Sequence, residues 1–370
     1  MKRPCKSFDT PAYAALRQAK QGNVHRAFHT TIKNKNERMK HCISVLTIVM
    51  FMFPGVKGQS YHFSQFFSTP LLTNPANTGL TDGPYRLSSN FRAQGLSGGS
   101  PYLTGYISAD ISPFREKLLE GHKAGVGLYV MNDQSLDGAI TANSAGLSAA
   151  YSVGLDKEGV HTLGIGFQGT YHQRELDVSK LSFDSQFGGT GYDPSLPIGE
   201  DFQYYKRNYF DLNTGILYRA QGEKVSFFGG ISGYNILKHE ENALVDEFKM
   251  PTRYVAQAGA QFLSGTNGTI YTSLTYMYQA KASAMSVGAA YGIQLTEGEQ
   301  NKILFGAWYR LKDALIPYVG YQKNGFQLGL TYDYTTSSKK TGAEIRNGYE
   351  LTLMFTAPDK NELKRALPWY

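Results

Sequence analysis

The chain has 370 residues, two cysteines, and 37 Lys and Arg against 30 Asp and Glu, a formal net charge of +7. Residues 1–58 hold 11 of the basic residues but only two acidic ones, which leaves 26 basic and 28 acidic residues in 59–370, a net charge of −2. Cys5 and Cys42 both lie before residue 59. Without the first 58 residues, the composition excludes a disulfide framework and gives no reason to expect a nucleic-acid partner.

Residues 39–58 have the pattern of a secretory signal peptide. A short basic start at Lys40 and His41 is followed by an apolar run over 42–53, and small residues precede a cleavage site after Gly58. The apolar run is too short for a membrane-spanning helix, which needs about 20 apolar residues. The sequence therefore predicts export of a mature chain of residues 59–370.

Two segments on either side of the signal peptide lack a regular pattern. Residues 1–38 are basic and weakly patterned, and we interpret them as a mis-assigned start or an extended leader. Residues 59–83 are rich in aromatic residues and contain Pro70 and Pro75, which exclude the interior of a sheet. Exposed apolar surface costs about 25 cal/mol per Å², so we expect this segment to be packed against something on the periplasmic side.

From residue 84 onward, the sequence alternates apolar and polar residues with the period of two that is typical of β-strands. The segment 326–335 shows this without a fault: one face holds Leu328, Leu330 and Tyr332, and the other holds Gln327, Thr331 and Asp333. We expect an Arg at Leu330 to destabilise the fold and an Arg at Thr331 to be tolerated. Such segments number about 14: 84–95, 101–111, 122–131, 140–154, 160–172, 206–218, 224–237, 252–264, 269–280, 284–295, 302–311, 314–322, 326–335 and 345–356.

Strands of about ten residues separated by turn residues are typical of a transmembrane β-barrel. We predict an all-β, antiparallel outer-membrane barrel over residues 84–356, followed by a tail, 357–370, with both termini in the periplasm. Fourteen strands are expected, although 12 are possible because 101–111 and 284–295 are the weakest segments. The tight turns should lie at one mouth and the longest connection, Gln173 to Tyr205, at the other. The alternative is a soluble β-sandwich, whose strands usually have about 5–6 residues.

The residues that carry chemistry form no recognisable catalytic, cofactor or metal site. The histidines of the mature chain lack metal-ligand spacing, and no HExxH motif occurs. A barrel enzyme would need a Ser–His pair, for which His172 is a faint candidate. The glycines of "GVGLY" and "GIGF" lie inside strands, where they permit close packing. Arg310, Asp333 and Glu350 should point into the barrel and be paired with each other or hydrated. We predict no enzymatic activity, no cofactor and no metal.

The segment "FSQFFSTPLLTNPANTG" resembles the start of mature PorP/SprF-type outer-membrane proteins of the type IX secretion system. The matching elements are Phe63-Ser64-Gln65 and Asn74-Pro75-Ala76. The resemblance continues in the same order through Gly127–Asp133, Leu176–Leu181 and Phe305–Thr335. The leader and the C-terminal tail depart from the family's pattern.

This resemblance implies a non-enzymatic barrel that serves the secretion or surface attachment of an adhesin or other cargo protein. The implied partners are periplasmic lipoproteins and ring components of that system, the cargo itself, and outer-membrane lipid. We expect a partner to be contacted by Phe63, Phe66, Phe67, Asn74 and Pro75. The alternative is that this segment only plugs the barrel. A passive transporter for a small apolar solute is a further possible function.

Overall fold

The computed structural model describes residues 63–81, 83–96, 100–114, 118–119, 121–188, 191–198, 205–237, 250–295, 301–337 and 347–358. The chain divides into residues 1–55 and 56–370, and every described residue belongs to the second part. The predicted leader and signal peptide, and most of the predicted tail, therefore lie outside the described residues. Within the described ranges, no helix is long and apolar enough to span a membrane.

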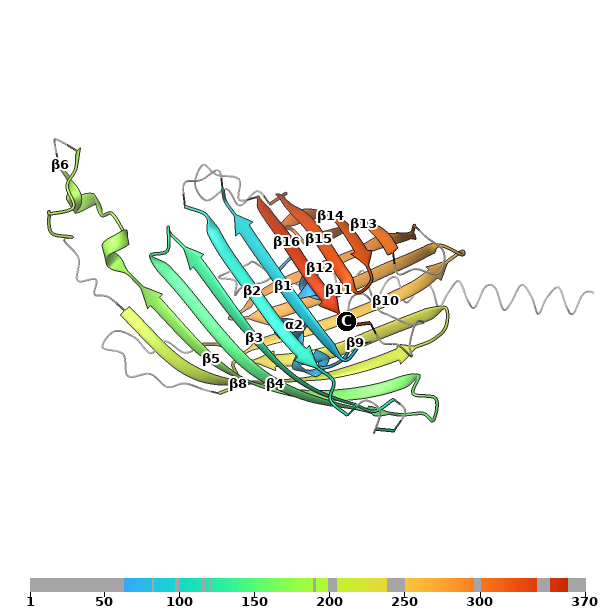
Figure 1. Cartoon of the computed structure of the whole chain (residues 1–370). Helices are drawn as coiled ribbons and strands as arrows, with labels where there is room; N and C mark the ends of the chain where they lie inside the picture. Colours follow the sequence, from blue (N-terminus) through green and yellow to red (C-terminus); the bar gives the residue numbers. More distant parts are fainter. Residues whose placement is uncertain are drawn as a thin grey trace, which may run out of the picture. The chain divides into compact units, whose positions relative to one another are not determined.

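Fourteen antiparallel strands close into one barrel (Figure 1). The strands are β1 (Tyr85–Gln94), β2 (Tyr102–Ile111), β3 (Lys123–Ser135), β4 (Ile140–Gly154), β5 (His161–Leu176), β8 (Tyr205–Gln221), β9 (Val225–Tyr234), β10 (Arg253–Ser264), β11 (Gly268–Gln279), β12 (Ala282–Gln294), β13 (Asn301–Arg310), β14 (Ala314–Lys323), β15 (Phe326–Thr335) and β16 (Gly348–Thr356). Each strand pairs with the next along the chain, β5 pairs with β8, and β16 closes the barrel on β1. The prediction of a 14-stranded barrel is confirmed, including the two weakest segments.

The connection between β5 and β8 contains structure that the sequence analysis did not predict. Two short helical turns, η3 (Val178–Lys180) and η4 (Asp184–Gln186), precede a two-stranded sheet of β6 (Phe187–Gly188) and β7 (Gly191–Tyr192). Strands of two residues are too short to show a period of two, which explains why the sequence pattern missed them.

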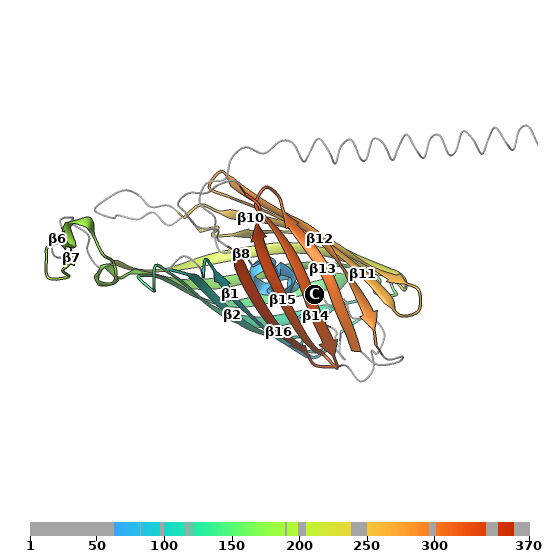
Figure 2. The same ribbon diagram turned by 90° about the horizontal axis from the view of Figure 1, so that it is seen from above.

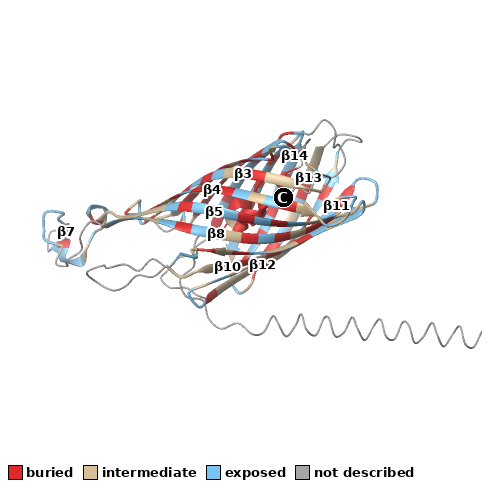
Figure 3. Ribbon diagram, turned by 90° about the horizontal axis from the view of Figure 1, so that it is seen from below, coloured by how far each residue is buried: buried red, intermediate tan, exposed pale blue. Residues whose placement is uncertain are grey.

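Side chains alternate between the outside and the inside of the barrel along each strand, as Figure 3 shows by the alternation of exposed and buried residues. On β15, Leu328 and Leu330 are 38% and 51% exposed, and Tyr332 is partly exposed. Their neighbours Gln327, Thr331 and Asp333 are buried inside the barrel. The predicted outward and inward faces of this strand are therefore confirmed.

The two mouths of the barrel differ in their connections. The turn mouth has short turns at 222–224, 265–267 and 324–325, whereas the loop mouth has the connections 177–204, 235–252 and 336–347. The longest connection lies at the mouth opposite these three turns, as predicted. Tight turns are not confined to one mouth, however, because the loop mouth also has short turns at 136–139, 280–281 and 311–313. The chain enters β1 and leaves β16 at the turn mouth, where the backbone N–H of Ala357 donates to the carbonyl of Tyr85 at 3.0 Å.

Leu330→Arg tests whether the outward face of β15 contacts lipid. We expect this substitution to lower the free energy of unfolding by about 2–4 kcal/mol, because a guanidinium near the middle of a bilayer is poorly solvated. Tyr334→Arg is the matched control, since it lies on the same face near the loop mouth, where the cost is about 0–1 kcal/mol. Urea unfolding in lipid vesicles measures both. Equal losses would mean that this face does not cross the hydrocarbon region.

Candidate functional site

Residues 63–81 lie inside the barrel, where they form a compact segment that we call the plug (Figure 2). The plug contains η1 (Phe66–Ser68), α2 (Pro70–Thr73) and η2 (Pro75–Asn77), all of them short. Pro70 and Pro75 each stand at a first helical position, where a missing backbone N–H costs nothing. Asn74 caps η2 by accepting the backbone N–H of Ala76 at 2.9 Å. The prolines thus set the shape of the plug and prevent it from joining the sheet.

One end of the plug is bound to a buried glutamate near the loop mouth. The backbone N–H groups of Ser64 and Gln65 donate to the two carboxylate oxygens of Glu350, at 2.6 and 2.9 Å. The hydroxyl of Ser64 donates to Asp333 at 2.7 Å, and the hydroxyl of Thr352 donates to the side-chain oxygen of Gln65 at 2.7 Å. The Phe-Ser-Gln motif therefore docks on the inner faces of β15 and β16.

Two arginines balance the two carboxylates at this end. Arg92 on β1 forms ion pairs with Asp333, at 3.0 Å, and with Glu350. Arg310 at the end of β13 forms an ion pair with Asp333 at 2.8 Å and donates to the hydroxyl of Ser64 at 3.1 Å. All four charged side chains are buried, so each needs its partner to offset desolvation. We call Arg92, Arg310, Asp333 and Glu350 the charge cluster.

The other end of the plug is bound to a second buried ion pair near the turn mouth. Arg86 on β1 donates to both carboxylate oxygens of Asp110 on β2, at 3.0 and 2.8 Å. Asp110 also accepts the backbone N–H of Gly79 at 2.7 Å, and Arg86 donates to the carbonyl of Asn77 at 3.1 Å. The plug therefore runs from the charge cluster near the loop mouth to this pair near the turn mouth.

Aromatic side chains of the plug pack against the barrel wall. The ring of Phe67 lies 5.1 Å from that of Trp308 and 5.6 Å from that of Tyr318, between ring centroids. Near the start of the plug, Phe63 contacts Tyr106 on β2 at a centroid distance of 6.1 Å. Edge-on and tilted pairs of this kind stabilise more than their buried area alone does.

The Asn-Pro-Ala motif lies on a surface of glycines on the inner wall. Side chains at Gly166 on β5 and Gly215 on β8 would overlap the backbone of Pro75 and the side chain of Asn74, respectively. The Asn74 side-chain amide donates to the backbone carbonyls of Ile216 and Ile231, at 3.1 and 3.3 Å. Close approach of the plug to the sheet therefore requires glycine here, as expected for the glycine of "GIGF".

Gly166→Val tests this close approach. We expect it to displace the plug and to lower barrel stability by about 1–3 kcal/mol or more, because the new side chain has no space beside Pro75. Gly169→Val is the matched control on the same strand, since a side chain there points outward and meets nothing within 4 Å. Urea unfolding of both proteins checks the difference. Unfolding midpoints that shift equally would show that the plug does not rest on Gly166.

The plug lies deeper than the periplasmic mouth at which residues 59–83 were expected to pack. Five predicted partner-contacting residues, Phe63, Phe66, Phe67, Asn74 and Pro75, are all buried, the phenylalanines at 5% exposure or less. Their burial favours the plug alternative, because none of these side chains is accessible to another protein in this conformation. Partner binding by these residues stays a prediction.

The inner face of β15 also differs from expectation. Thr331 is buried, and its hydroxyl accepts a hydrogen bond from the side-chain amide of Gln65 at 3.4 Å. An Arg at this position would have to displace the plug. The expectation that Thr331→Arg is tolerated assumed a water-filled interior, so the structure contradicts its physical basis.

The sequence-predicted inward charges form only part of the observed charge cluster. The pairing of Arg310 with Asp333 is confirmed, but the main partner of Glu350 is Arg92, which the sequence analysis missed. Arg92 faces Glu350 across the closure between β1 and β16. The alternation in β1 indicates that Arg92 points inward, yet only the closure of the barrel shows which residue it meets.

A polar cavity lies between the plug and the loop mouth, and we call it the loop-side cavity. Its lining includes Leu72 of the plug and, from the wall, His172, Arg174, Tyr209, Tyr234 and Arg253. His172, the faint catalytic candidate, stacks on Tyr209 at a centroid distance of 4.8 Å. Arg253 lies over the ring of Tyr234 at 4.3 Å, a cation–π contact. The cavity thus offers positive charge and aromatic rings to whatever enters from the loop side.

The comparison with known families is decisive for the identity of the chain. Residues 55–355 match the family described as type IX secretion system membrane protein PorP/SprF. The chain belongs to the PorP/SprF family. The two motifs that carry the resemblance at the sequence level, Phe63-Ser64-Gln65 and Asn74-Pro75-Ala76, both dock the plug of this PorP/SprF protein on the barrel wall.

Two solved structures with similar folds have low sequence identity to this PorP/SprF protein. The toluene transporter TbuX of Ralstonia pickettii is 10% identical, with 82% of this chain and 97% of that chain covered and a TM-score of 0.49. A Pseudomonas aeruginosa FadL homologue is 10% identical, with 77% and 98% covered and a TM-score of 0.44. With TM-scores below 0.5, these similarities say nothing of what this chain binds. No curated protein matches the chain.

Proposed function

We propose that this protein is a non-enzymatic, plugged barrel of the type IX secretion system that supports the secretion or surface attachment of an adhesin or other cargo protein. The observation that supports this most is the plug, which fills the interior and is bound at both ends to buried charges. A filled barrel is a poor passage for solutes, so its contribution to secretion comes from contacts with other proteins. The proposed partners are periplasmic lipoproteins and ring components, and the cargo.

The orientation in the membrane forms part of the proposal. Bacterial barrels have short turns on the periplasmic side and long loops on the outside, which supports a periplasmic position of the turn mouth. The C-terminal tail leaves β16 at the turn mouth. Ser64 lies near the loop-side ends of β15 and β16. A periplasmic position of both termini stays a prediction.

In this orientation the loop-side cavity opens toward the cell surface. Arg174, Arg253 and His172 line it together with tyrosine rings. Its volume of about 60 Å³ suits one acidic side chain of a cargo protein rather than a longer segment. A passive transporter for a small apolar solute, the alternative function, is less consistent with this lining and with the plug below it.

Affinity purification of the tagged protein from outer membranes tests the proposal. We expect periplasmic secretion components or a secreted cargo protein to co-purify with the barrel in mild detergent. Recovery of the folded barrel alone, with a small apolar solute retained, would instead support the transporter alternative.

The double substitution Phe66→Ser and Phe67→Ser asks whether the plug itself holds the partner. Partner contact by these residues predicts that the partners no longer co-purify with a barrel that stays folded. Because both rings are buried, a plug alone predicts lower barrel stability with the partners retained. Loss of the partners from a barrel that remains folded, as judged by its heat-modifiable migration on gels, would mean that the plug leaves the interior to bind them.

A further inference from the structure

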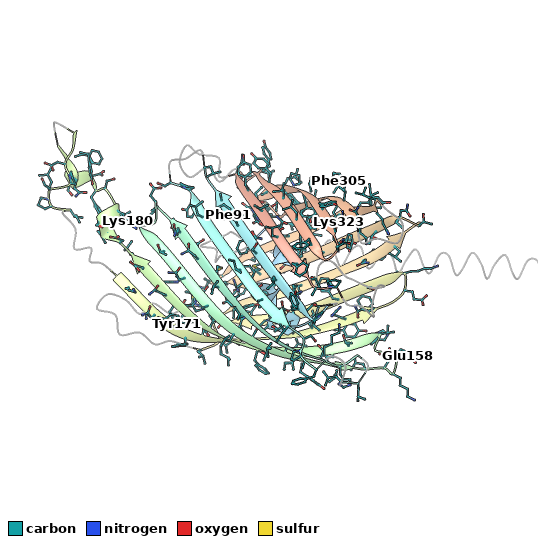
Figure 4. All side chains as sticks on the ribbon, in the orientation of Figure 1. Phe91, Glu158, Tyr171, Lys180, Phe305 and Lys323 are labelled. Carbon is teal, nitrogen blue, oxygen red and sulfur yellow. The ribbon has the colours of Figure 1, made fainter. Side chains whose placement is uncertain are left out.

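The outer wall of the barrel carries a groove on the half nearer the loop mouth. It has a volume of about 640 Å³ and extends across β16, β1, β2, β3, β4 and β5. Apolar side chains that point outward line most of it: Phe91, Ile107, Val130, Tyr171, Leu351 and Leu353. Figure 4 labels Phe91 and Tyr171, which come from the two sides of this surface.

The floor of the groove is made of small residues. Gly105 on β2 is one of them, and a side chain built there would meet nothing within 4 Å. Ser89 and Ala145, which also line the groove, are small as well. Large outward side chains surround these three positions, so the wall is hollowed rather than flat. The open space at Gly105 means that this glycine is not required for packing of the barrel itself.

A row of side-chain amides forms one edge of the groove. Gly105 pairs with Asn132, Asn132 with Asn143, and Asn143 with Gln173 across three neighbouring strand pairs. The Asn132 amide donates to Asn143 at 2.6 Å, and the Asn143 amide donates to Gln173 at 3.2 Å. Within the part of the chain that the structure describes, the side-chain oxygen of Asn132 and the side-chain nitrogen of Gln173 make no hydrogen bond. The row therefore offers an acceptor at one end and a donor at the other.

The amide row lies where the outer surface changes from apolar to charged. Toward the turn mouth, the next row of outward residues that pair across the strands is Val130, Ala145, Tyr171 and Phe210. Toward the loop mouth, the next such row is Gln134, Thr141, Glu175 and Lys206. The charged groups of Glu175 and Lys206 lie 4.0 Å apart. Charged residues are costly in the hydrocarbon region, and aromatic residues concentrate at its edge. The groove thus extends from the headgroup level into the hydrocarbon.

We propose that this groove binds one lipid molecule of the leaflet at the loop mouth. One acyl chain lies over Gly105 between Phe91, Ile107 and Val130, and a carbonyl of the linkage to the headgroup accepts a hydrogen bond from the amide row. A groove of 300–1,000 Å³ with an apolar lining and a few polar groups is typical of a small-molecule site. Because the row is uncharged, it recognises the linkage rather than the charge of the headgroup.

The size of the groove favours a lipid over a protein partner. Its lining has 16 residues, some of which face the interior, whereas each side of a stable protein interface contributes roughly 20–30 residues. An acyl chain is also the molecule that already surrounds this part of the wall in a membrane.

Filling the groove with a side chain tests the proposal. Phosphatidylethanolamine is the probe, and native mass spectrometry of the full-length mature barrel in detergent measures the fraction that retains one lipid molecule. We expect Gly105→Leu to lower this fraction at least about fivefold, since the leucine would occupy the floor. Gly169→Leu is the matched control, because its side chain also enters open space on the outer face, outside the groove. Heat-modifiable migration on gels confirms that both variants are folded.

The role of the amide row is tested with a second lipid. An ether-linked phosphatidylethanolamine lacks the ester carbonyls, so the wild-type barrel should retain it roughly threefold to tenfold less than the ester form. In Asn143→Ala this preference should disappear. Equal retention of lipid by Gly105→Leu, Gly169→Leu and the wild type would overturn the proposal. So would loss of a co-purifying polypeptide from Gly105→Leu with lipid unchanged, because the groove would then be a protein interface.

Discussion

Glu350→Ala is expected to lower the free energy of unfolding of the barrel by about 3–5 kcal/mol, the cost of removing one partner from a buried ion pair. Glu350 accepts the backbone N–H groups of Ser64 and Gln65 and pairs with Arg92. Its removal leaves Asp333 as the one carboxylate paired with Arg92 among the described residues, and it leaves two buried N–H groups of the plug without an acceptor. The plug should therefore detach at its loop-side end before the barrel unfolds.

Urea unfolding of the barrel in lipid vesicles measures this loss. Glu175→Ala is the control, because Glu175 pairs with Lys206 at 4.0 Å on the partly exposed outer surface, where a pair is worth about 0.2–1 kcal/mol. Similar losses for the two variants would show that the charge cluster does not hold the plug.

Phe67→Ala is expected to cost about 3–5 kcal/mol, the range for truncating a buried phenylalanine. Phe67 packs against Trp308 and Tyr318, so its removal opens a cavity beside the indole ring. In a Trp369→Phe background Trp308 is the sole tryptophan of the chain. Its fluorescence should therefore become more accessible to acrylamide in the Phe67→Ala variant.

Phe210→Ala provides the comparison for Phe67→Ala. Phe210 is 68% exposed on the outer wall, and its truncation should leave the accessibility of Trp308 unchanged. Unchanged stability and unchanged accessibility in Phe67→Ala would mean that the plug is not packed against Trp308 in the membrane.

The strands were predictable because alternation is a local property of the sequence. Leu328 and Leu330 point outward and Gln327 and Asp333 inward simply because successive side chains of a strand alternate. The contacts that hold the plug are not local. Glu350 contacts Ser64, which lies 286 positions earlier in the sequence. Predicting this contact requires the register of every strand pair and the closure of the barrel.

The sequence predicts that the plug is a docked segment, but it does not predict which surface the plug docks on. Its phenylalanines indicate that it needs an apolar contact, and the barrel interior, a partner and the periplasmic mouth all offer one. The residues that allow the segment to dock in the interior lie on distant strands. Gly166 and Gly215 are examples, because they leave space for Asn74 and Pro75. The amide row has the same property, since Asn132, Asn143 and Gln173 are isolated polar residues until the sheet aligns them.

Electrical recording from the mature barrel in a planar lipid bilayer tests most directly whether the plug closes the interior. The plug predicts no steady current above that of the bare bilayer for the wild type, and intermittent conductance for Glu350→Ala and Phe67→Ala. A steady, voltage-independent conductance through the wild-type barrel would contradict the assignment of residues 63–81 as a plug.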